Sequence, residues 1–450
     1  MARVAKMRAP AAVAVALLLA VLTLLPNGVQ ADLLDGAGLE LPALSEVSSG
    51  WMHSCGLGQD GKVYCWGNNA TGNLGDGTAA NARPLAKRVD GMDAPAIQVS
   101  SGADHSCALT TNGDAWCWGG NLSGQLGVNS DTLVLRRQPG KVVDGYRGIA
   151  LPRFVQISAG GSHSCALAEN GVPWCWGAND VGQLGSTPPS AILPDDGGDA
   201  RPVWTSQMGT ATKIIAGAAH TCAINTVSEL WCWGDNGAGQ LGVNSKQEAW
   251  SPVRVHATGG FPDGGVATVA LGTTHTCAST RNGNAYCWGD NSYGRIGSTS
   301  PTSDTAQGPD SLVPQKVRPY PGSRAETGIG GNANMRFADL MGVSAGLDHS
   351  CAWTRTGVGW CWGRAAYGHL GDGTVSASQP KPRFQVVEYT LQFVDTGAIQ
   401  HISAGYNHTC SLNANGRAHC WGHNGFGQVG DGTFVFHHRP AKVLQLDAPV

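Results

Sequence analysis

The sequence is poor in charged residues, which make up 14% of its 450 positions. Its 29 lysines and arginines are scattered along the chain and are outnumbered by 32 acidic residues, which gives a net charge of −3 at pH 7. A protein that binds nucleic acid needs a cationic surface to hold the phosphates. The composition therefore disfavours nucleic acid as a partner.

Long apolar stretches are also scarce, and the one near the start of the chain is too short to cross a membrane. Ala11–Leu25 is apolar apart from one threonine, whereas a transmembrane helix needs about 20 such residues. Three basic residues precede this stretch and a small-residue segment ending at Ala31 follows it, as in a secretory signal peptide. We therefore predict a signal peptide over residues 1–31, a lead-in over residues 32–43, and a secreted or periplasmic mature protein without a membrane span.

The motifs of several common enzyme classes are missing. The chain has no Gly-x-Ser-x-Gly, His-Glu-x-x-His or P-loop sequence. Gly237–Gly242 and Gly425–Gly430 have the glycine spacing of a dinucleotide-binding loop, but neither opens a helix, so both are interpreted as products of an internal repeat. Asp195–Asp199 is acidic but lacks the full spacing of a calcium-binding loop. We therefore predict no catalytic residues, no cofactor and no metal site, and leave open whether any loop binds calcium.

No cysteine stands outside a regular pattern. The 14 cysteines form seven pairs, each with nine residues between its members. The pairs are Cys55/Cys65, Cys107/Cys117, Cys165/Cys175, Cys222/Cys232, Cys277/Cys287, Cys351/Cys361 and Cys410/Cys420. Successive pairs recur after 52, 58, 57, 55, 74 and 59 positions, and a period of this length indicates a repeat architecture. A cysteine set that is wholly paired also favours an oxidising compartment.

The second repeat illustrates the structure expected of each unit. Four short extended segments, Ala96–Gly102, Asp104–Leu109, Ala115–Gly119 and Gln138–Val143, are separated by turn residues, with nothing helical between them. Seven such units predict an all-β fold, a seven-bladed β-propeller made of four-stranded antiparallel blades. The expected blades cover residues 44–95, 96–152, 153–211, 212–264, 265–336, 337–397 and 398–450. The repeats begin at a first strand and end at a fourth, so no strand is obviously borrowed from the N-terminus, and the mode of ring closure stays open.

The turn between the second and third strands predicts how the cysteines pair. The midpoint of each pair falls on a residue, so the hairpin loop has an odd length, and a three-residue loop favours glycine at its third position. Ser228 is the exception at this position, and the other six repeats have Gly61, Gly113, Gly171, Gly283, Gly357 and Gly416. Counted outward from this loop, the two cysteines face each other where neighbouring Cα atoms approach to about 4.5 Å, a distance that a disulfide accepts. We predict seven intra-blade disulfides. Metal binding by His-x-Cys and the second cysteine, as in His105, Cys107 and Cys117, is the less favoured alternative.

One phrase recurs in every unit: Ala-Gly-x-x-His-Ser-Cys-Ala-Leu, then Gly, then Trp-Cys-Trp-Gly-x-Asn-x-x-Gly-Gln-Leu-Gly. It stands almost intact in Ala159–Leu167 and Trp174–Gly185. The phrase resembles the repeat of the regulator of chromosome condensation family, and the resemblance covers residues 44–450. It implies a seven-bladed propeller of about this repeat length.

The family resemblance does not transfer one activity to this chain. The best-known member is a nuclear exchange factor for the GTPase Ran that also docks on chromatin, whereas this chain carries an export signal and paired cysteines. The chain is more similar to the secreted bacterial branch, one member of which inhibits β-lactamases through loops at one mouth of the ring. Family membership therefore implies a fold and a mode of binding, and leaves the partner unidentified.

The histidine and the tryptophan of the phrase are interpreted as structural, because a residue needed once for chemistry has no reason to recur in every blade. We expect each histidine to bond backbone near the turn between the first and second strands. These are His53, His105, His163, His220, His275, His349 and His408. We expect each tryptophan to pack between neighbouring blades with its indole N–H bonded to a loop carbonyl. These are Trp66, Trp118, Trp176, Trp233, Trp288, Trp362 and Trp421.

Function is expected where the repeat loses its symmetry, and aromatic and arginine side chains are the usual anchors of protein interfaces. The candidate partner-binding residues lie in three irregular loops and in the Gly-Gln-Leu-Gly position of two repeats. They are Tyr146, Arg147, Trp204, Arg295, Arg318, Tyr320, Arg336 and His369. We predict a monomeric, non-enzymatic scaffold that binds a secreted or cell-surface protein. The alternatives are a protein that binds or acts on extracellular carbohydrate and, by family name only, a guanine-nucleotide exchange factor.

Overall fold

The computed structural model describes residues 41–128, 133–143, 150–185, 201–203, 207–255, 261, 264–297, 309–318, 337–373, 375, 385–386 and 398–445. The signal peptide expected over residues 1–31 and most of the lead-in over residues 32–43 lie outside these residues. No helix in the described part of the chain is long and apolar enough to cross a bilayer.

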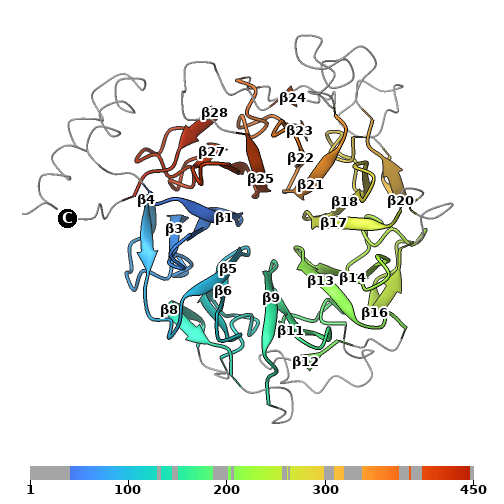
Figure 1. The fold of residues 1–450 in the computed structure, drawn as a ribbon, viewed down its shortest axis with the longest axis horizontal. Helices are drawn as coiled ribbons and strands as arrows, with labels where there is room; N and C mark the ends of the chain where they lie inside the picture. Colours follow the sequence, from blue (N-terminus) through green and yellow to red (C-terminus); the bar gives the residue numbers. More distant parts are fainter. Residues whose placement is uncertain are drawn as a thin grey trace, which may run out of the picture.

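Seven four-stranded antiparallel sheets are arranged as blades around a central axis (Figure 1). Within each sheet the four strands keep their sequence order, so every blade is a simple meander. The predicted all-β, seven-bladed propeller is therefore confirmed. Six of the seven sheets fall inside one of the predicted blade ranges, and the fourth begins one residue before its range, at Ala211; the boundaries between blades stay predictions.

The strands occupy the same places in every blade. The innermost strands, which surround the axis in Figure 1, are β1 (Leu44–Ser49), β5 (Ala96–Ser101), β9 (Phe154–Ala159), β13 (Ala211–Ala216), β17 (Val266–Leu271), β21 (Leu340–Ala345) and β25 (Ile399–Ala404). The second strands are β2 (His53–Gly58), β6 (His105–Thr110), β10 (His163–Ala168), β14 (His220–Asn225), β18 (His275–Thr280), β22 (His349–Thr354) and β26 (His408–Asn413). The third strands are β3 (Val63–Asn68), β7 (Ala115–Gly120), β11 (Pro173–Gly177), β15 (Leu230–Gly234), β19 (Ala285–Gly289), β23 (Gly359–Gly363) and β27 (Ala418–Gly422). The outer strands are β4 (Ala82–Val89), β8 (Leu135–Lys141), β12 (Arg201–Pro202), β16 (Ala249–Arg254), β20 (Ser311–Lys316), β24 (Gln385–Val386) and β28 (His437–Lys442).

The hairpins between second and third strands have the predicted loop geometry. The third loop residue is left-handed throughout, from φ 72° at Gly283 to φ 82° at Gly357, and φ is 64° even at Ser228. In the first blade, this loop places Cys55 of β2 directly opposite Cys65 of β3. The same register recurs in the hairpins of the other six blades.

All seven predicted disulfides are present, and no cysteine is free. They link Cys55 to Cys65, Cys107 to Cys117, Cys165 to Cys175, Cys222 to Cys232, Cys277 to Cys287, Cys351 to Cys361 and Cys410 to Cys420. The linked Cα atoms are 4.0–4.1 Å apart, which is closer than the expected separation of about 4.5 Å. The alternative of metal binding is excluded, because both thiols of every pair are consumed by the cross-link.

The hydrophobic core lies between blades rather than within one sheet. One cluster joins Leu109 and Leu126 of the second blade to Phe154, Ile157 and Trp176 of the third. The seven motif tryptophans are fully buried in seams of this kind, which confirms their predicted place between blades. Truncation of a large buried aromatic side chain typically costs about 3–5 kcal/mol, so these seams contribute strongly to the stability of the ring.

The ring closes by the same kind of packing, without strand exchange among the described residues. Leu44 N donates to Gly416 O over 2.7 Å, which joins the first blade to the last. Val47 and Trp66 share a core cluster with Leu412 of the seventh blade. In addition, Ala86 in β4 forms a parallel bridge to the segment after β28. Closure therefore depends on contacts between blades one and seven.

Candidate functional site

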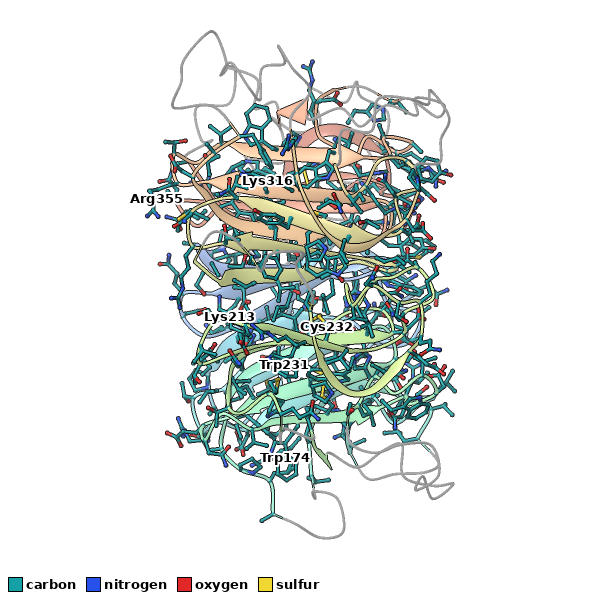
Figure 2. The ribbon with its side chains drawn as sticks, turned by 90° about the vertical axis from the view of Figure 1, so that its right-hand side faces the viewer. Trp174, Lys213, Trp231, Cys232, Lys316 and Arg355 are labelled. Carbon is teal, nitrogen blue, oxygen red and sulfur yellow. A yellow bond between two sulfur atoms is a disulfide. The ribbon has the colours of Figure 1, made fainter. Side chains whose placement is uncertain are left out.

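The strand order gives the propeller two different faces. Turns between first and second strands and loops between third and fourth strands emerge on one side, which we call the loop face. The turns of the second–third strand hairpins emerge on the other side, the hairpin face. Figure 2 shows the ring edge-on, with Arg355 of a hairpin turn marking the hairpin face. A partner that approaches along the axis therefore meets loops from one side and hairpins from the other.

The disulfide cysteines lie inside the blades and take no part in either face. Every one of the fourteen side chains has an exposed fraction of 0%. The members on the third strands, which follow the hairpin turn, are Cys65, Cys117, Cys175, Cys232, Cys287, Cys361 and Cys420. The cysteines are therefore structural, and the candidate binding surface is formed by other residues.

A repeated set of hydrogen bonds joins neighbouring blades near the loop face. In the second seam, His105 Nε2 lies 2.8 Å from Ser164 Oγ of the next blade. That hydroxyl donates to Gln125 O over 2.9 Å, and Trp176 Nε1 donates to the same carbonyl over 2.9 Å. Each seam has this arrangement of histidine, hydroxyl, carbonyl and indole. The tryptophan prediction is confirmed, whereas the backbone partner expected for the histidine was wrong because the ring reaches the next blade's hydroxyl.

Burial disfavours the charged form of most seam histidines. Each hydroxyl proton is given to a carbonyl, so the histidine must donate through Nε2 and leave Nδ1 unprotonated. Burial lowers the pKa of His53, His163, His275 and His408 to about 3 and that of His220 to about 4. Among the described residues, six of the seven Nδ1 atoms have no hydrogen-bond or ion-pair partner, so a second proton there would be an unpaired buried charge, whereas His105 Nδ1 lies 3.6 Å from Asp104 Oδ1. The histidines with lowered pKa values therefore hold the seams together as neutral rings at neutral pH.

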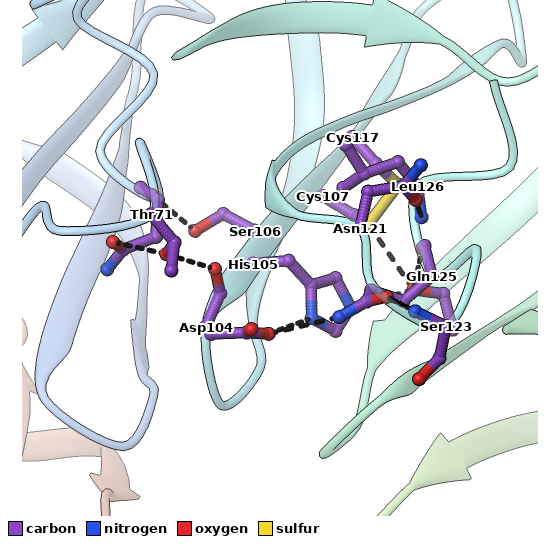
Figure 3. A network of polar contacts seen from close by, with 12 residues as sticks. Thr71, Asp104, His105, Ser106, Cys107, Cys117, Asn121, Ser123, Gln125 and Leu126 are labelled. Atoms are coloured by element: carbon purple, nitrogen blue, oxygen red, sulfur yellow. Dashed lines mark hydrogen bonds and ion pairs between the residues drawn. A yellow bond between two sulfur atoms is a disulfide. The ribbon is translucent and has the colours of Figure 1, made fainter. Parts of the chain in front are cut away.

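The seam between the fifth and sixth blades keeps this arrangement and adds a group of charged side chains to it. Arg295 occupies the place of the seam glutamine and lies 2.7 Å from Asp348 and 3.1 Å from Asp290. Arg364 lies 3.0 Å from Asp348, and its guanidinium stands 4.8 Å from the centre of the Tyr293 ring. The Arg295 side chain is only 4% exposed. The network is therefore a partly buried ionic bridge between two blades. Figure 3 shows the second blade, where Gln125 takes the place of Arg295 and a single carboxylate, Asp104, contacts His105 and Gln125.

The mouth of the axial channel is also asymmetric on the loop face. The turn after each first strand contributes one residue there, and in five blades it is small or aliphatic: Ala103, Gly161, Ala218, Thr273 and Leu347. In the first and last blades it is aromatic, and the rings of Trp51 and Tyr406 lie 5.0 Å apart. Trp51 is 40% exposed. Closure of the ring therefore creates an aromatic pair at the mouth.

A second aromatic group stands on the last two blades, in loops that emerge on the same loop face. The His423 ring lies 4.5 Å from Phe436 and 5.3 Å from Tyr367 of the sixth blade. Phe426 also packs against His423, at 6.2 Å. We call Trp51, Tyr406, Tyr367, His423, Phe426, Phe434 and Phe436 the aromatic patch. Phe434 is 51% exposed and Phe436 is 40% exposed, so the patch offers rings to solvent.

Comparison with known proteins gives the family. A model described as the RCC1-like domain matches residues 26–398, and the regulator of chromosome condensation (RCC1) repeat matches residues 399–428. The chain belongs to the RCC1-like domain family. The resemblance predicted from the repeated phrase is thereby confirmed, while membership of a secreted bacterial branch stays a prediction.

Relatives of this RCC1-like chain have varied names. The ultraviolet-B receptor UVR8 of Arabidopsis thaliana is 28% identical over 402 residues, which cover 89% of this chain and 81% of UVR8. The E3 ubiquitin-protein ligase HERC2 of Homo sapiens is 26% identical over 392 residues, which cover 86% of this chain but only 7% of HERC2. Among solved structures, human WBSCR16 matches with a TM-score of 0.70 at 19% identity, covering 86% of this chain and 96% of WBSCR16. Prp20p of Saccharomyces cerevisiae matches with a TM-score of 0.65 at 22% identity, covering 81% of each chain. At these identities the two structures show the fold alone.

The predicted binding residues of the RCC1-like chain fall into three groups. Arg295 and His369 are buried in seams, so their side chains are inaccessible in this conformation and their contact with a partner stays untested. Arg318 is exposed just beyond β20. The remaining candidates, Tyr146, Arg147, Trp204, Tyr320 and Arg336, lie outside the described residues.

The residues of the aromatic patch were missed from the sequence. Trp51 and Tyr406 stand directly after the glycine that ends the first strand, where the other repeats have smaller residues. A comparison of the seven repeats position by position could have found them, because each replaces a small side chain with a large aromatic ring. A comparison of loop lengths could not, since neither residue belongs to an insertion.

Proposed function

We propose that the protein is an exported, non-enzymatic scaffold that binds another protein through the aromatic patch on its loop face. One observation carries the proposal. The exposed Trp and Phe side chains of the described residues are Trp51, Phe434 and Phe436, and all three lie on the same face. Exposed aromatic groups of this kind are typical anchors of protein interfaces.

The relatives and the disulfides support the two halves of this proposal. The structure report on Prp20p describes its binding to Gsp1p and histones, and another describes Kap60 bound to yeast RCC1. Propellers of this fold thus offer surfaces to protein partners, although their partners are not transferred to this chain. Seven disulfides favour a location outside the reducing cytoplasm. Guanine-nucleotide exchange stays an alternative that a nucleotide-release assay on a GTPase would decide.

The proposal is tested by capture with matched surface variants. The mature chain is immobilised and exposed to extracellular extract, in parallel with the double variant Phe434→Ser/Phe436→Ser and with Val227→Ser. Val227 is 70% exposed in a hairpin turn, so its substitution removes a comparable apolar group from the hairpin face. We expect the native chain and Val227→Ser to retain the same protein. The affinity of the double variant for that protein should be lower by roughly 100-fold or more, because central aromatic anchors contribute most of the binding energy.

The variants must also retain the fold for this comparison to count. Val227 and Phe434 are 70% and 51% exposed, and changes at such sites usually alter stability by less than about 0.5 kcal/mol. Phe436 is 40% exposed and packs on His423, so the Tm of the double variant is measured beside that of the native chain. A partner that binds the double variant as tightly as the native chain would contradict the proposal. Loss of binding with Val227→Ser alone would move the interface to the hairpin face.

A further inference from the structure

A cavity of about 550 Å³ opens between a loop and the outer strand β16 on the fourth blade. Its described lining consists of Asp235, Gly237, Lys246, Gln247, Glu248 and Trp250, which we call the blade-four pocket. Small-molecule sites commonly occupy about 300–1,000 Å³, whereas the cavity of the axial channel holds about 240 Å³. We propose that the blade-four pocket binds a neutral pyranose ring, such as a sugar residue of a glycan.

Trp250 provides the flat apolar wall that such a ligand needs. Its indole lies directly on the backbone of the third blade, because a Cβ added at Gly182 would stand 2.9 Å from its ring atoms Cγ and Cδ2. With one side supported by glycine, the tryptophan lines the cavity with its remaining surface. The carbon-bound hydrogens on one side of a pyranose ring form an apolar surface that packs on an aromatic face.

Trp250 is also a departure from the repeat. Other blades have a glycine equivalent to Gly182 in the loop between their third and fourth strands. In each described contact, that glycine touches a different residue of the next blade's outer strand. The contacts are Gly72 with Arg137, Gly239 with Leu312, Gly368 with His438 and Gly427 with Pro84. Only the contact of Gly182 involves an indole among these five. The packing therefore accepts several side chains, and stability alone does not require tryptophan at this position.

The polar groups of the pocket are held in place before any ligand binds. Asp235 accepts hydrogen bonds from Gly237 N over 3.0 Å and from Gln240 Nε2 over 2.7 Å. The backbone of Gln247 is fixed at both ends, since its N–H donates to Ser245 Oγ and its carbonyl accepts from Asn236. A preorganised set of groups that includes carboxylate and amide oxygens, an amide NH₂ and an ammonium suits a ligand with many hydroxyls, each of which both donates and accepts.

The charges of the pocket decide between classes of ligand. Two carboxylates, on Asp235 and Glu248, face a single ammonium on Lys246, which is paired with Asp310 at 2.7 Å. This balance disfavours phosphates and other anions. A quaternary ammonium ligand would find one indole rather than a cage of several rings. A neutral polyol remains the ligand that uses both the donors and the acceptors.

The test uses the full mature chain and simple sugars, and it does not depend on the proposed protein partner. The probes are methyl β-D-glucopyranoside, methyl β-D-galactopyranoside, methyl α-D-mannopyranoside and N-acetyl-D-glucosamine, with choline chloride and inorganic phosphate as competing classes. Binding is followed by saturation-transfer NMR and by tryptophan fluorescence. We expect at least one sugar to saturate with a Kd on the order of 1–10 mM, as for a single ring in an open site.

Two variants localise the binding. Trp250→Leu introduces the residue that Leu312 supplies at the equivalent contact of the next blade, so the fold should be kept, and sugar affinity should fall roughly tenfold or more. Trp51→Leu removes a tryptophan from the aromatic patch and should leave sugar binding unchanged. Absence of saturation by every sugar, equal affinity in Trp250→Leu, or binding of choline or phosphate in place of sugar would each overturn the proposal.

Discussion

At the scale of single residues, the seam histidines act as hydrogen-bond donors between neighbouring blades. Each one reaches a serine or threonine of the next blade, and the same hydroxyl donates onward to a carbonyl that also accepts an indole N–H. The sequence shows a serine or threonine after every motif histidine, but it does not show that the contact crosses to another blade. The structural role of these histidines could therefore be predicted, whereas their partners could not.

The first prediction concerns pH. The folded-state pKa of several seam histidines is about 3, well below the unfolded value of 6.5, because burial disfavours the charged ring. Their stabilising contribution is therefore complete above pH 6.5 and is lost as the pH falls toward 3, by up to about 1.4 kcal/mol per histidine and pH unit. We expect the Tm to fall by roughly 10 °C or more between pH 7 and pH 4.5, measured by circular dichroism.

One group opposes this trend. Burial raises the pKa of Glu46 to about 7, so its contribution is present in acid and is lost as the pH rises through that value. A single carboxyl cannot offset several histidines, so the net change keeps its sign. A Tm that stays constant or rises on acidification to pH 4.5 would show that the seam histidines are charged in the folded protein.

The second prediction removes one hydroxyl from a seam. Thr221→Val leaves the His163 N–H buried without an acceptor, since Thr221 Oγ1 is its partner at 2.9 Å. We expect a loss of about 1–3 kcal/mol, the typical penalty for an unsatisfied buried polar group. Thr221→Ser is the matched control, because the equivalent residue is Ser54, Ser106 or Ser164 in other blades, and it should cost no more than about 1 kcal/mol. Equal losses in denaturant titrations of the two variants would contradict this account of the seam.

At the scale of elements, the hairpin between the second and third strands is the best-predicted part of the molecule. Its loop length, its left-handed third residue and its facing cysteines depend only on residues close together in sequence. Ser228 stands where the other six loops have glycine, and it still adopts φ 64°. The facing cysteines on either side fix the length of the loop, and a loop of that length needs a left-handed third residue. The outer strands were harder to place, since they pair across loops of variable length.

The third prediction tests one of the intra-blade disulfides. Replacing Cys222 and Cys232 with alanine removes the cross-link from β14 to β15 in the fourth blade. A disulfide that closes a small loop contributes about 2–3 kcal/mol, so we expect the Tm to fall and hydrogen exchange to increase in that blade and its seams. Peptide mapping of the unreduced native chain should find the seven pairs, each within one blade. Cysteines linked between blades, or an unchanged Tm in the double variant, would contradict the proposed stabilising role of the intra-blade disulfides.

At the scale of the whole molecule, the ring is regular in its seams and irregular on its loop face. Trp51 and Tyr406 come from opposite ends of the chain and meet only when the first and last blades pack together. A contact of this kind cannot be predicted from local pattern, because it depends on the number of blades and on how the ring closes. The fold class and the disulfides could be predicted from sequence, whereas the aromatic patch and the blade-four pocket needed the assembled ring.

The fourth prediction is the most direct test of the account, which holds that this asymmetric loop face is the binding surface. Hydrogen–deuterium exchange is measured on the full mature chain, alone and with the captured partner. We expect slower exchange in the complex at residues 50–52, 364–371 and 423–436, with no change in the hairpin turns at residues 59–61 and 226–228. Protection confined to the hairpin turns or to the outer strands, with the aromatic patch unchanged, would contradict it.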